Sequence, residues 1–363
     1  MKKNDPLYGV KSRVLKVPAY TLRADDAEIK LNQNENPYDF PDDLKEETFR
    51  RFRERSWSRY PDFVPDSLRL RLAEFAGWQK DGVLVGNGSN ELLQASLMVL
   101  IKSRTRVAIP FPTFTVYRLI ANVLGAGIVD IPLNPDLTFN VDDLISKSQE
   151  SGADVLIINT PNNPTGSVLY NDDLRRILEQ FSGHVLLDEA YYEFWGRTAI
   201  DFLKEYPRLI ITRTFSKAMG MAGLRVGYLL AHPDLAAQIS KAKLPYNVNQ
   251  FSLTAAEVAL DNISRFRSPI QAVIKERDRL ATELDRMPGL KVHPTKSNFF
   301  LIEVPVAPHL IFDSLYRQGI LIRDVSSYPM LSKCLRISVG TPDENNRLLS
   351  ALRTALNAEA INA

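Results

Sequence analysis

One stretch of the sequence places a single lysine among small and apolar neighbours and reads Thr214-Phe215-Ser216-Lys217-Ala218-Met219-Gly220-Met221-Ala222-Gly223-Leu224-Arg225. Apolar, β-branched runs precede and follow it, so it is expected to connect two strands of a sheet. Apolar surroundings disfavour a charged ammonium and lower the pKa of a lysine, and such an amine is suited to forming a Schiff base. The alternative is an exposed loop lysine. Exposed loops rarely have the composition of residues 218–223, so the functional interpretation of Lys217 is favoured.

Apolar runs of strand length alternate with helical patterns on both sides of this stretch. From about residue 82 the runs are separated by segments such as Asp172–Phe181, in which apolar side chains recur every three or four residues. This alternation is typical of the α/β class, in which helices cover a mostly parallel sheet. The seven strands predicted for the sheet are Val83–Val85, Val107–Ile109, Ile128–Ile131, Val155–Ile158, Val185–Leu187, Leu209–Ile211 and Val226–Leu230.

The alternation of strand-length apolar runs with helical patterns ends at about residue 250, where a second, smaller α+β domain is expected to begin. Two long helical patterns, Leu253–Phe266 and Ile270–Met287, come first. A last helix is expected to begin with a capping box, because Thr341 is followed by a proline and, three residues on, by Glu344. The strands predicted in this part are Phe299–Val304, Ile320–Ile322 and Leu335–Val339.

Length and composition limit the class of protein. The 363 residues suffice for two or three domains, and 45 Lys and Arg against 43 Asp and Glu leave a net charge of +2. So small an excess disfavours nucleic acid as a partner. One cysteine excludes an internal disulfide, and four scattered histidines offer no Cys/His zinc site. Neither a secretory signal nor an apolar run of the roughly 20 residues that cross a bilayer is readable, so the expected compartment is the cytosol.

Three further polar motifs follow predicted strands, at the edge where open α/β sheets bind ligands. Gly86–Glu91 is a glycine turn before an apolar helix, which suits a bound phosphate but equally describes a plain corner. Thr160–Gly166 contains two prolines and by composition is a turn. Asp188–Tyr191 begins with a carboxylate, and such an acid either serves in a site or caps a helix. The position of all these motifs at one edge of the predicted sheet is stronger evidence for a binding site than any single motif.

Together these groups meet the requirements of pyridoxal 5′-phosphate. That cofactor needs a lysine for its aldehyde, an acid opposite its pyridinium nitrogen and a cradle for its phosphate. Lys217 meets the first need and Asp188 the second. The turn Gly88–Asn90, together with Arg225, meets the third. Pyridoxal 5′-phosphate is therefore the predicted cofactor.

The sequence resembles the pyridoxal-phosphate aminotransferases of fold type I, and within them the histidinol-phosphate aminotransferase family. The motifs that carry the resemblance run from Leu31–Tyr38 through Arg59–Asp62 to Leu335–Thr341. It implies a large cofactor-binding domain over residues 36–250 and a small, discontinuous domain made of residues 1–35 and 251–363. It also implies a homodimer, in which a tyrosine of each subunit, Tyr60, reaches the cofactor of the other.

The same resemblance implies a role for each residue of the site. Lys217 would be the Schiff-base lysine and proton carrier, Asp188 would pair with the pyridinium nitrogen, and Asn163 and Tyr191 would bind the ring's phenolic oxygen. Phe114 stands where the family stacks an aromatic ring, often a tyrosine, and Asn90 where it often has an acid. The implied cofactor-binding residues are Gly88, Ser89, Asn90, Phe114, Asn163, Asp188, Tyr191, Thr214, Ser216, Lys217, Arg225 and Tyr60 of the partner subunit.

Two arginines carry the expected choice of substrate. Arg336 matches the arginine with which aminotransferases bind a substrate carboxylate, and Arg323 resembles the second arginine of the histidinol-phosphate family. Two guanidinium groups suit a phosphate dianion better than a single carboxylate. The alternative for Arg323 is a surface or interface salt bridge. The implied substrate-binding residues are Tyr20, Asn34, Tyr246, Arg323 and Arg336.

The implied reaction transfers an amino group between L-histidinol phosphate and 2-oxoglutarate, which becomes glutamate, in histidine biosynthesis. Two other activities of the same fold stay open: an aromatic amino-acid aminotransferase and a decarboxylase of a phosphorylated amino acid. A cofactor-binding regulator without turnover is a third alternative. Such regulators normally carry a DNA-binding domain, for which the short N-terminal segment is expected to leave no room.

Overall fold

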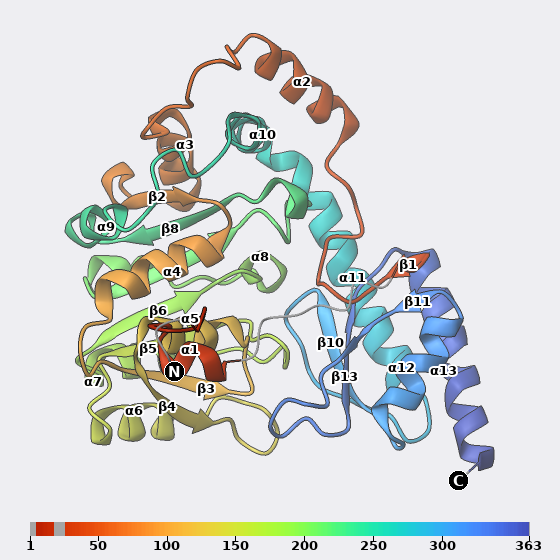
Figure 1. Ribbon diagram of the computed structural model, residues 1–363. Coiled ribbons are helices and arrows are strands. Elements are labelled where there is room, and N and C mark those ends of the chain that lie inside the picture. Colours follow the sequence, from red (N-terminus) through yellow and green to blue (C-terminus); the bar gives the residue numbers. More distant parts are fainter. Residues whose placement is uncertain (1–4, 18–25, 363) are drawn as a thin grey trace.

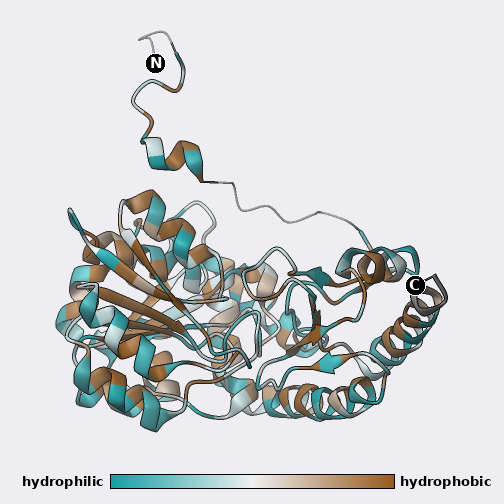
Figure 2. Cartoon of the chain, turned by 90° about the horizontal axis from the view of Figure 1, so that it is seen from below, coloured by the Kyte–Doolittle hydropathy of each residue, from teal (hydrophilic) through white to brown (hydrophobic). Residues whose placement is uncertain are grey.

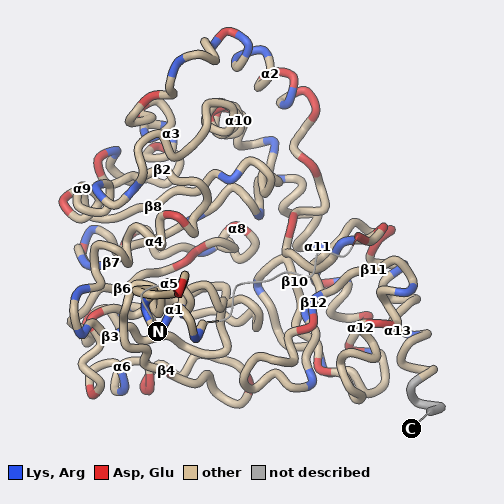
Figure 3. The backbone as a smooth tube through the Cα atoms, in the orientation of Figure 1, with Lys and Arg blue, Asp and Glu red and all other residues tan. Residues whose placement is uncertain are grey.

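The computed structural model describes residues 5–17 and 26–362. A large layered unit lies beside a smaller one that contains the C-terminal helix (Figure 1). Acidic and basic residues are interspersed over the helices and loops of both units (Figure 3), in keeping with the net charge of +2. Within the described ranges, no helix is long and apolar enough to cross a membrane.

The large unit is built on a sheet that has seven strands in the described residues and contains every strand predicted for it. Strand β8 is antiparallel to both of its neighbours, and the other pairs are parallel. The predicted mostly parallel α/β sheet is therefore confirmed. In spatial order the strands are β2 (Val83–Gly86), β8 (Gly227–Ala231), β7 (Leu209–Thr214), β6 (His184–Asp188), β5 (Val155–Asn159), β3 (Arg106–Phe111) and β4 (Gly127–Pro132).

Helices cover both faces of this sheet, because successive side chains of a strand enter opposite apolar cores. On β6, Leu186 belongs to one core, and Val185 and Leu187 belong to the other. The apolar strands accordingly lie between helices whose outer faces are hydrophilic (Figure 2). The first core includes α4 (Ser89–Leu100), α5 (Val116–Leu124) and α9 (Pro233–Ser240), and the second α3 (Asp66–Ala76), α6 (Val141–Glu150), α7 (Asn171–Gln180) and α10 (Gln250–Asp261).

The smaller unit has its own core, formed by α11 (Arg267–Asp285), α12 (Pro308–Arg317) and α13 (Pro342–Asn362) against a small antiparallel sheet. A two-stranded parallel sheet joins β1 (Ile29–Lys30) to β11 (Ile320–Leu321). This pairing ties the N-terminal segment to the C-terminal part of the chain. The antiparallel sheet contains, in order, β12 (Arg323–Asp324), β13 (Cys334–Ser338), β10 (Phe299–Glu303) and β9 (Lys291–Val292).

The predicted capping box forms at the start of α13. The amide of Glu344 donates to Oγ1 of Thr341 at 3.3 Å, and the amide of Thr341 donates to Oε2 of Glu344 at 2.7 Å. These two bonds satisfy groups that a helix N-terminus leaves without a partner. The remaining elements are short: α1 (Ser12–Lys16), α8 (Tyr192–Trp195), and 3₁₀ turns at Lys80–Gly82, Ile200–Lys204, Ala222–Leu224 and Ile263–Phe266.

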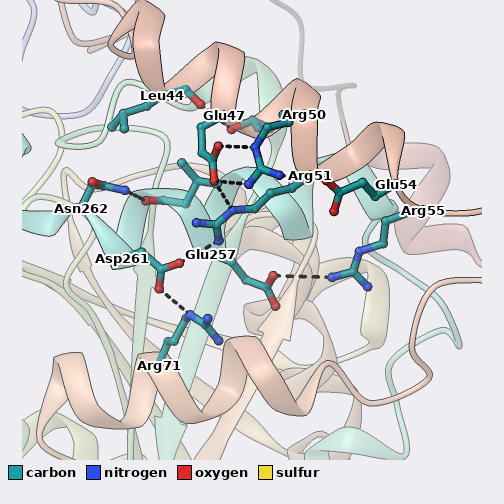
Figure 4. Close-up of polar contacts among 12 residues, drawn as sticks. Leu44, Glu47, Arg50, Arg51, Glu54, Arg55, Arg71, Glu257, Asp261 and Asn262 are labelled. Carbon is teal, nitrogen blue, oxygen red and sulfur yellow. Dashed lines mark hydrogen bonds and ion pairs between the residues drawn. The ribbon is translucent and has the colours of Figure 1, made fainter.

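Helix α10 packs with the large unit, although it lies beyond residue 250. The carboxylate of Asp261 accepts hydrogen bonds from Arg51 of α2 (Asp42–Arg53) at 2.8 Å and from Arg71 of α3 at 2.7 Å (Figure 4). Apolar side chains of α10 also belong to a core of the large sheet. We therefore propose that the C-terminal part of the small domain begins after α10 rather than at residue 251. Periodicity identifies the apolar face of a helix but not the core that the face joins.

Candidate active site

A cavity of about 380 Å³ lies where the carboxyl ends of β5, β6 and β7 meet the small antiparallel sheet. Asn159, Asp188 and Thr214, the last residues of these three strands, line it. Motifs far apart in the sequence meet here because parallel strands end at one edge of a sheet. The predicted site residues that line the cavity are Asn34, Ser89, Asn90, Phe114, Asn163, Asp188, Tyr191, Thr214, Ser216, Lys217, Arg225, Arg323 and Arg336.

Lys217 lies in the cavity wall just beyond β7. Its Nζ donates a 2.8 Å hydrogen bond to the main-chain oxygen of Gln33. Burial and, after it, the charge of Arg336 lower the pKa of this amine to about 8, although the carboxylate of Glu35 opposes the change. Near pH 8 a large fraction of Lys217 is therefore neutral, and a neutral amine can bind an aldehyde or accept a proton.

Asp188 ends β6 and is only 4% exposed. Its Oδ2 accepts a 2.6 Å hydrogen bond from the phenol of Tyr117, and its Oδ1 accepts one from the amide of Ala190 at 3.1 Å. Burial raises the pKa of Asp188 to about 6, although these hydrogen bonds act in the opposite direction. The carboxylate is therefore held in place and is still ionised at neutral pH.

The sequence interpretation missed Tyr117 and Asn159, which both line the cavity. The side chain of Asn159 donates to the main-chain oxygen of Asp188 at 2.9 Å and accepts from the amide of Asn163 at 2.8 Å. The sequence did contain a signal for Asn159, because this residue directly follows the predicted strand Val155–Ile158 and precedes the motif that contains Asn163. Tyr117 lies in α5, three residues after Phe114, and contacts Phe114 edge to face, with ring centroids 5.4 Å apart.

The turn before α4 forms a tight cradle. Gly88 precedes the helix with φ 78°, and a Cβ added there would lie 2.6 Å from Nη2 of Arg225. A Cβ on Gly227 would lie 2.3 Å from the amide nitrogen of Ser89. Nη1 of Arg225 donates to Oγ of Ser216 at 3.1 Å. A helix N-terminus, a guanidinium and a hydroxyl thus converge at one place, which is the arrangement that binds a phosphate group.

Residues of the two units are hydrogen-bonded to each other across the cavity. Oδ1 of Asn163 accepts from Nη1 of Arg336 at 2.5 Å. The phenol oxygen of Tyr191 accepts from Nδ2 of Asn34 at 3.0 Å, and the amide of Asn34 donates to Oγ of Ser338 at 2.9 Å. The cavity is therefore formed by both units and depends on their relative position.

Arg323 and Arg336 stand directly opposite each other in the antiparallel pair β12–β13. Opposed residues of such a pair share a face of the sheet, and both of these line the cavity. Arg336 is buried, and its Nη2 donates to the main-chain oxygen of Asn32 at 2.6 Å. The sheet therefore brings two arginines to the cavity that Lys217 also lines.

Four predicted site residues are not among those that line this cavity, and one of them, Gly88, lies in the turn before α4. Tyr246 stacks on Tyr60, with ring centroids 4.5 Å apart, at an exposed surface. The predicted contact of Tyr246 with substrate therefore stays a prediction. Tyr60 is 80% exposed, as a residue expected to act in another subunit can be. Tyr20 lies outside the described residues.

The fold and the site have close counterparts among known proteins. Residues 26–352 match the family model for aminotransferase class I and II. The chain therefore belongs to the class I and II aminotransferases.

Within that class, the chain belongs to the histidinol-phosphate aminotransferase family. The protein of that name from Chlorobaculum tepidum is 40% identical over 329 residues, which are 90% of this chain and 94% of that protein. The one from Chlorobium luteolum is 39% identical over 343 residues, or 94% and 96% of the two chains. The histidinol-phosphate aminotransferase structure from Clostridium acetobutylicum is similar with a TM-score of 0.83 and 25% identity, covering 91% of this chain and 99% of that one.

A further solved structure confirms the fold. The histidinol-phosphate aminotransferase from Sinorhizobium meliloti, solved in complex with pyridoxal 5′-phosphate, has a TM-score of 0.87, with 22% identity over 97% of this chain and 99% of that one. Class I and II aminotransferases depend on pyridoxal 5′-phosphate, so the predicted cofactor is confirmed.

The geometry of the cavity fits this cofactor. The cradle beside Gly88 admits no added side-chain atom and offers donors for a phosphate. Asp188, buried and ionised, suits a pyridinium nitrogen, and Lys217, with its lowered pKa, suits an aldehyde carbon. Asp188, Lys217 and, from the cradle, Arg225 all line this one cavity.

Proposed function

We propose that this protein transfers an amino group between L-histidinol phosphate and 2-oxoglutarate. The observation that carries the proposal is the pair Arg323 and Arg336, which line the same cavity as Lys217. The relatives named histidinol-phosphate aminotransferase, at 38–40% identity over 90% or more of the chain, support it.

Two arginines distinguish a phosphorylated substrate from an ordinary amino acid. Each guanidinium donates to separate oxygens through a planar fork, so two of them satisfy a phosphate dianion more fully than a carboxylate. Arg336 already bonds Asn163 and Asn32, which holds it in one orientation. In the second half of the cycle the same pair would receive the carboxylate groups of 2-oxoglutarate.

We assign the cofactor to the residues that the cavity brings together. Bound pyridoxal 5′-phosphate supplies an electron sink that stabilises negative charge at the substrate's Cα. Asp188 would keep the ring nitrogen protonated, and Asn163 and Tyr191 would donate to the phenolic oxygen. Phe114 would pack on the ring, while Thr214 and Asn90 would complete its surroundings. The residues that would bind the phosphate are Gly88, Ser89, Ser216 and Arg225.

Lys217 is proposed to move the proton of the reaction. In its neutral form the amine would take a proton from the substrate's Cα at Nζ. The main-chain oxygen of Gln33, 2.8 Å from Nζ, accepts a hydrogen bond from the amine. Burial and the positive charge of Arg336 both favour its neutral form. The same nitrogen would then release the proton on the cofactor side of the cavity.

We also propose that the enzyme is a homodimer. Large apolar side chains are exposed together around the Tyr60–Tyr246 stack, and the ring of Phe63 lies 5.6 Å from that of Tyr246. Trp57 and Leu244 are 77% and 74% exposed. Exposed apolar clusters of this kind favour a protein partner. A second copy of the chain would cover the cluster and could bring Tyr60 and Tyr246 to a neighbouring cavity.

The proposed compartment is the cytoplasm. Cys334, the single cysteine of the sequence, is a buried free thiol. Burial raises its pKa to about 11, so it is unreactive and needs no oxidising environment.

Turnover of three amino donors tests the proposed substrate. Purified enzyme loaded with cofactor is given L-histidinol phosphate, L-phenylalanine or O-phospho-L-threonine, and amino transfer to 2-oxoglutarate and release of CO₂ are both measured. Rapid transfer from histidinol phosphate alone supports the proposal. A preference for phenylalanine would identify an aromatic aminotransferase, and CO₂ release from phosphothreonine would identify a decarboxylase.

A further inference from the structure

A buried ion pair joins β6 and β7 where these two strands end. Nε of Arg213 lies 2.9 Å from Oε2 of Glu189, and the two side chains are 3% and 2% exposed. Glu189 directly follows β6, and Arg213 is the penultimate residue of β7. Removing two charges from water is unfavourable unless their geometry and hydrogen bonds compensate. The contacts around the pair provide that compensation.

Thr198 and its neighbour complete the network. Nη2 of Arg213 donates to Oγ1 of Thr198 at 2.5 Å, and the same hydroxyl lies 2.8 Å from Oε2 of Glu189. The amide of Ala199 donates to Oε1 of Glu189 at 2.7 Å. The guanidinium of Arg213 also lies over the ring of Tyr192, 4.1 Å from its centroid. Both charged groups are thus held in single orientations from several sides.

The pair lies immediately behind the cavity. Asp188 and Thr214 line the cavity, whereas their chain neighbours Glu189 and Arg213 are not among the lining residues. Successive residues of a strand point to opposite faces, so the pair and the site occupy opposite sides of the same two strand ends. Lys217 follows Arg213 by four residues. A shift between the strand ends would therefore shift Asp188 relative to Lys217.

We propose that Glu189 and Arg213 are positioning residues that set the separation between Asp188 and Lys217. The paired register of β6 and β7 ends at Asp188 and Thr212, and the amide of Glu189 bonds the oxygen of Thr212 at 2.9 Å. Beyond that point the side-chain pair continues the connection. Asp188 and Lys217 hold opposite ends of the cofactor ring in the function proposed above, so the inference rests on that assignment.

The charge of the network supports a positional role. Glu193 also lies beside Arg213, but burial raises the pKa of Glu193 to about 8, so it is mostly neutral at pH 7. The single guanidinium therefore pairs with Glu189. An ion pair with one partner and a fork geometry defines a distance and a direction, which apolar packing of the same strand ends would define less sharply.

The test uses variants that change geometry with as little loss of folding as possible. Arg213→Lys keeps the charge but loses the fork, and Glu189→Gln keeps the shape but loses the charge. Arg277→Lys is the matched control, because Arg277 is also buried and paired, at 3.0 Å from Asp278, and does not line this cavity. For each variant we would measure the melting temperature, the pH midpoint of the visible absorbance of bound cofactor, and kcat and KM.

A positioning role predicts a specific pattern. Arg213→Lys and Glu189→Gln should move the absorbance midpoint by about one pH unit and lower kcat by up to about 100-fold, with KM nearly unchanged. Arg277→Lys should lower the melting temperature and leave the midpoint and kcat unchanged. If the two test variants behave like this control, the pair is only structural and the proposal fails.

Two further variants cover a failure of Arg213→Lys to fold and an error in the assignment of Lys217. Should Arg213→Lys not fold, the double variant Glu189→Gln/Arg213→Met buries no unpaired charge and must show the same shift of midpoint. Lys217→Ala should abolish the absorbance of the Schiff base between cofactor and enzyme, which is the absorbance that shifts with pH. If that absorbance survives, the assignment of Lys217 is wrong. If it is lost while the pair's variants shift nothing, only the positioning proposal is wrong.

Discussion

The phenol of Tyr117 donates a 2.6 Å hydrogen bond to the carboxylate of Asp188, 71 positions later in the chain. The contact joins the first turns of α5 to the end of β6. A carboxylate that accepts hydrogen bonds keeps its charge at lower pH. Tyr117 therefore opposes the effect of burial, which raises the pKa of Asp188 to about 6.

Replacement of Tyr117 by phenylalanine should weaken cofactor binding about 10-fold, because a hydrogen bond to a charged group contributes roughly 1.5 kcal/mol. The folded-state pKa of Asp188 lies above its ordinary value of 3.8, so the carboxylate is lost as pH falls through about 6. In Tyr117→Phe that loss should occur at higher pH. Titration of apoenzyme with cofactor and the acid limb of kcat/KM measure the two effects. An unchanged affinity and acid limb would show that Tyr117 does not support Asp188.

Replacement of Lys217 by alanine should abolish turnover, because no other amine in the part of the chain described lines the cavity. The basic variant Lys217→Arg retains a cation but no neutral amine, and it should be equally inactive. Steady-state assays at pH 8 with saturating cofactor measure both. Full activity in either variant would contradict the proposed proton transfer.

Replacement of Arg323 by glutamine should raise KM for histidinol phosphate by about 10- to 100-fold, the equivalent of roughly 1.5–3 kcal/mol for a charge-assisted hydrogen bond. KM for glutamate should change less, because a carboxylate presents less charge to Arg323 than a phosphate dianion does. Arg317→Gln is the matched control, since Arg317 is exposed at the end of α12. Equal effects of Arg323→Gln on both donors would remove the basis for phosphate recognition by this residue.

Replacement of Glu193 by glutamine should make stability less dependent on pH. The folded-state pKa of Glu193, about 8, lies above its ordinary value of 4.5. Its protonated form therefore stabilises the fold at low pH, and this contribution is lost as pH rises through about 8. Between pH 6 and pH 9 the melting temperature of Glu193→Gln should fall by a few degrees less than that of the wild type. Calorimetry beside the exposed control Glu150→Gln measures this, and identical pH profiles would disprove it.

Most of the large sheet could be predicted because its signal is local. The alternation of apolar runs with helical patterns depends only on residues close together in the sequence. Each predicted strand is present in the structure, with its ends shifted by only a few positions. The motifs after those strands were also predictable as a group, because parallel strands end at one edge. Lys217, Asp188 and Asn163 line one cavity for that reason.

The contacts between distant segments could not be predicted in this way. The amphipathic pattern of α10 does not state that Asp261 bonds Arg51 and Arg71. Nor does any pattern state that Arg213 pairs with Glu189, or that Tyr246 stacks on Tyr60 away from the cavity of its own chain. Each of these partners is chosen by the packing of whole elements.

The sequence by itself determined the order of strands and helices, the chemical groups available at the sheet edge, and the family to which the chain belongs. Only the tertiary structure decided which of those groups meet and how strongly each is charged. The reason is that the pKa values of Lys217 and Asp188 follow from burial and from neighbours such as Arg336 and Tyr117. Burial and long-range contacts arise only when the two units close around the cavity.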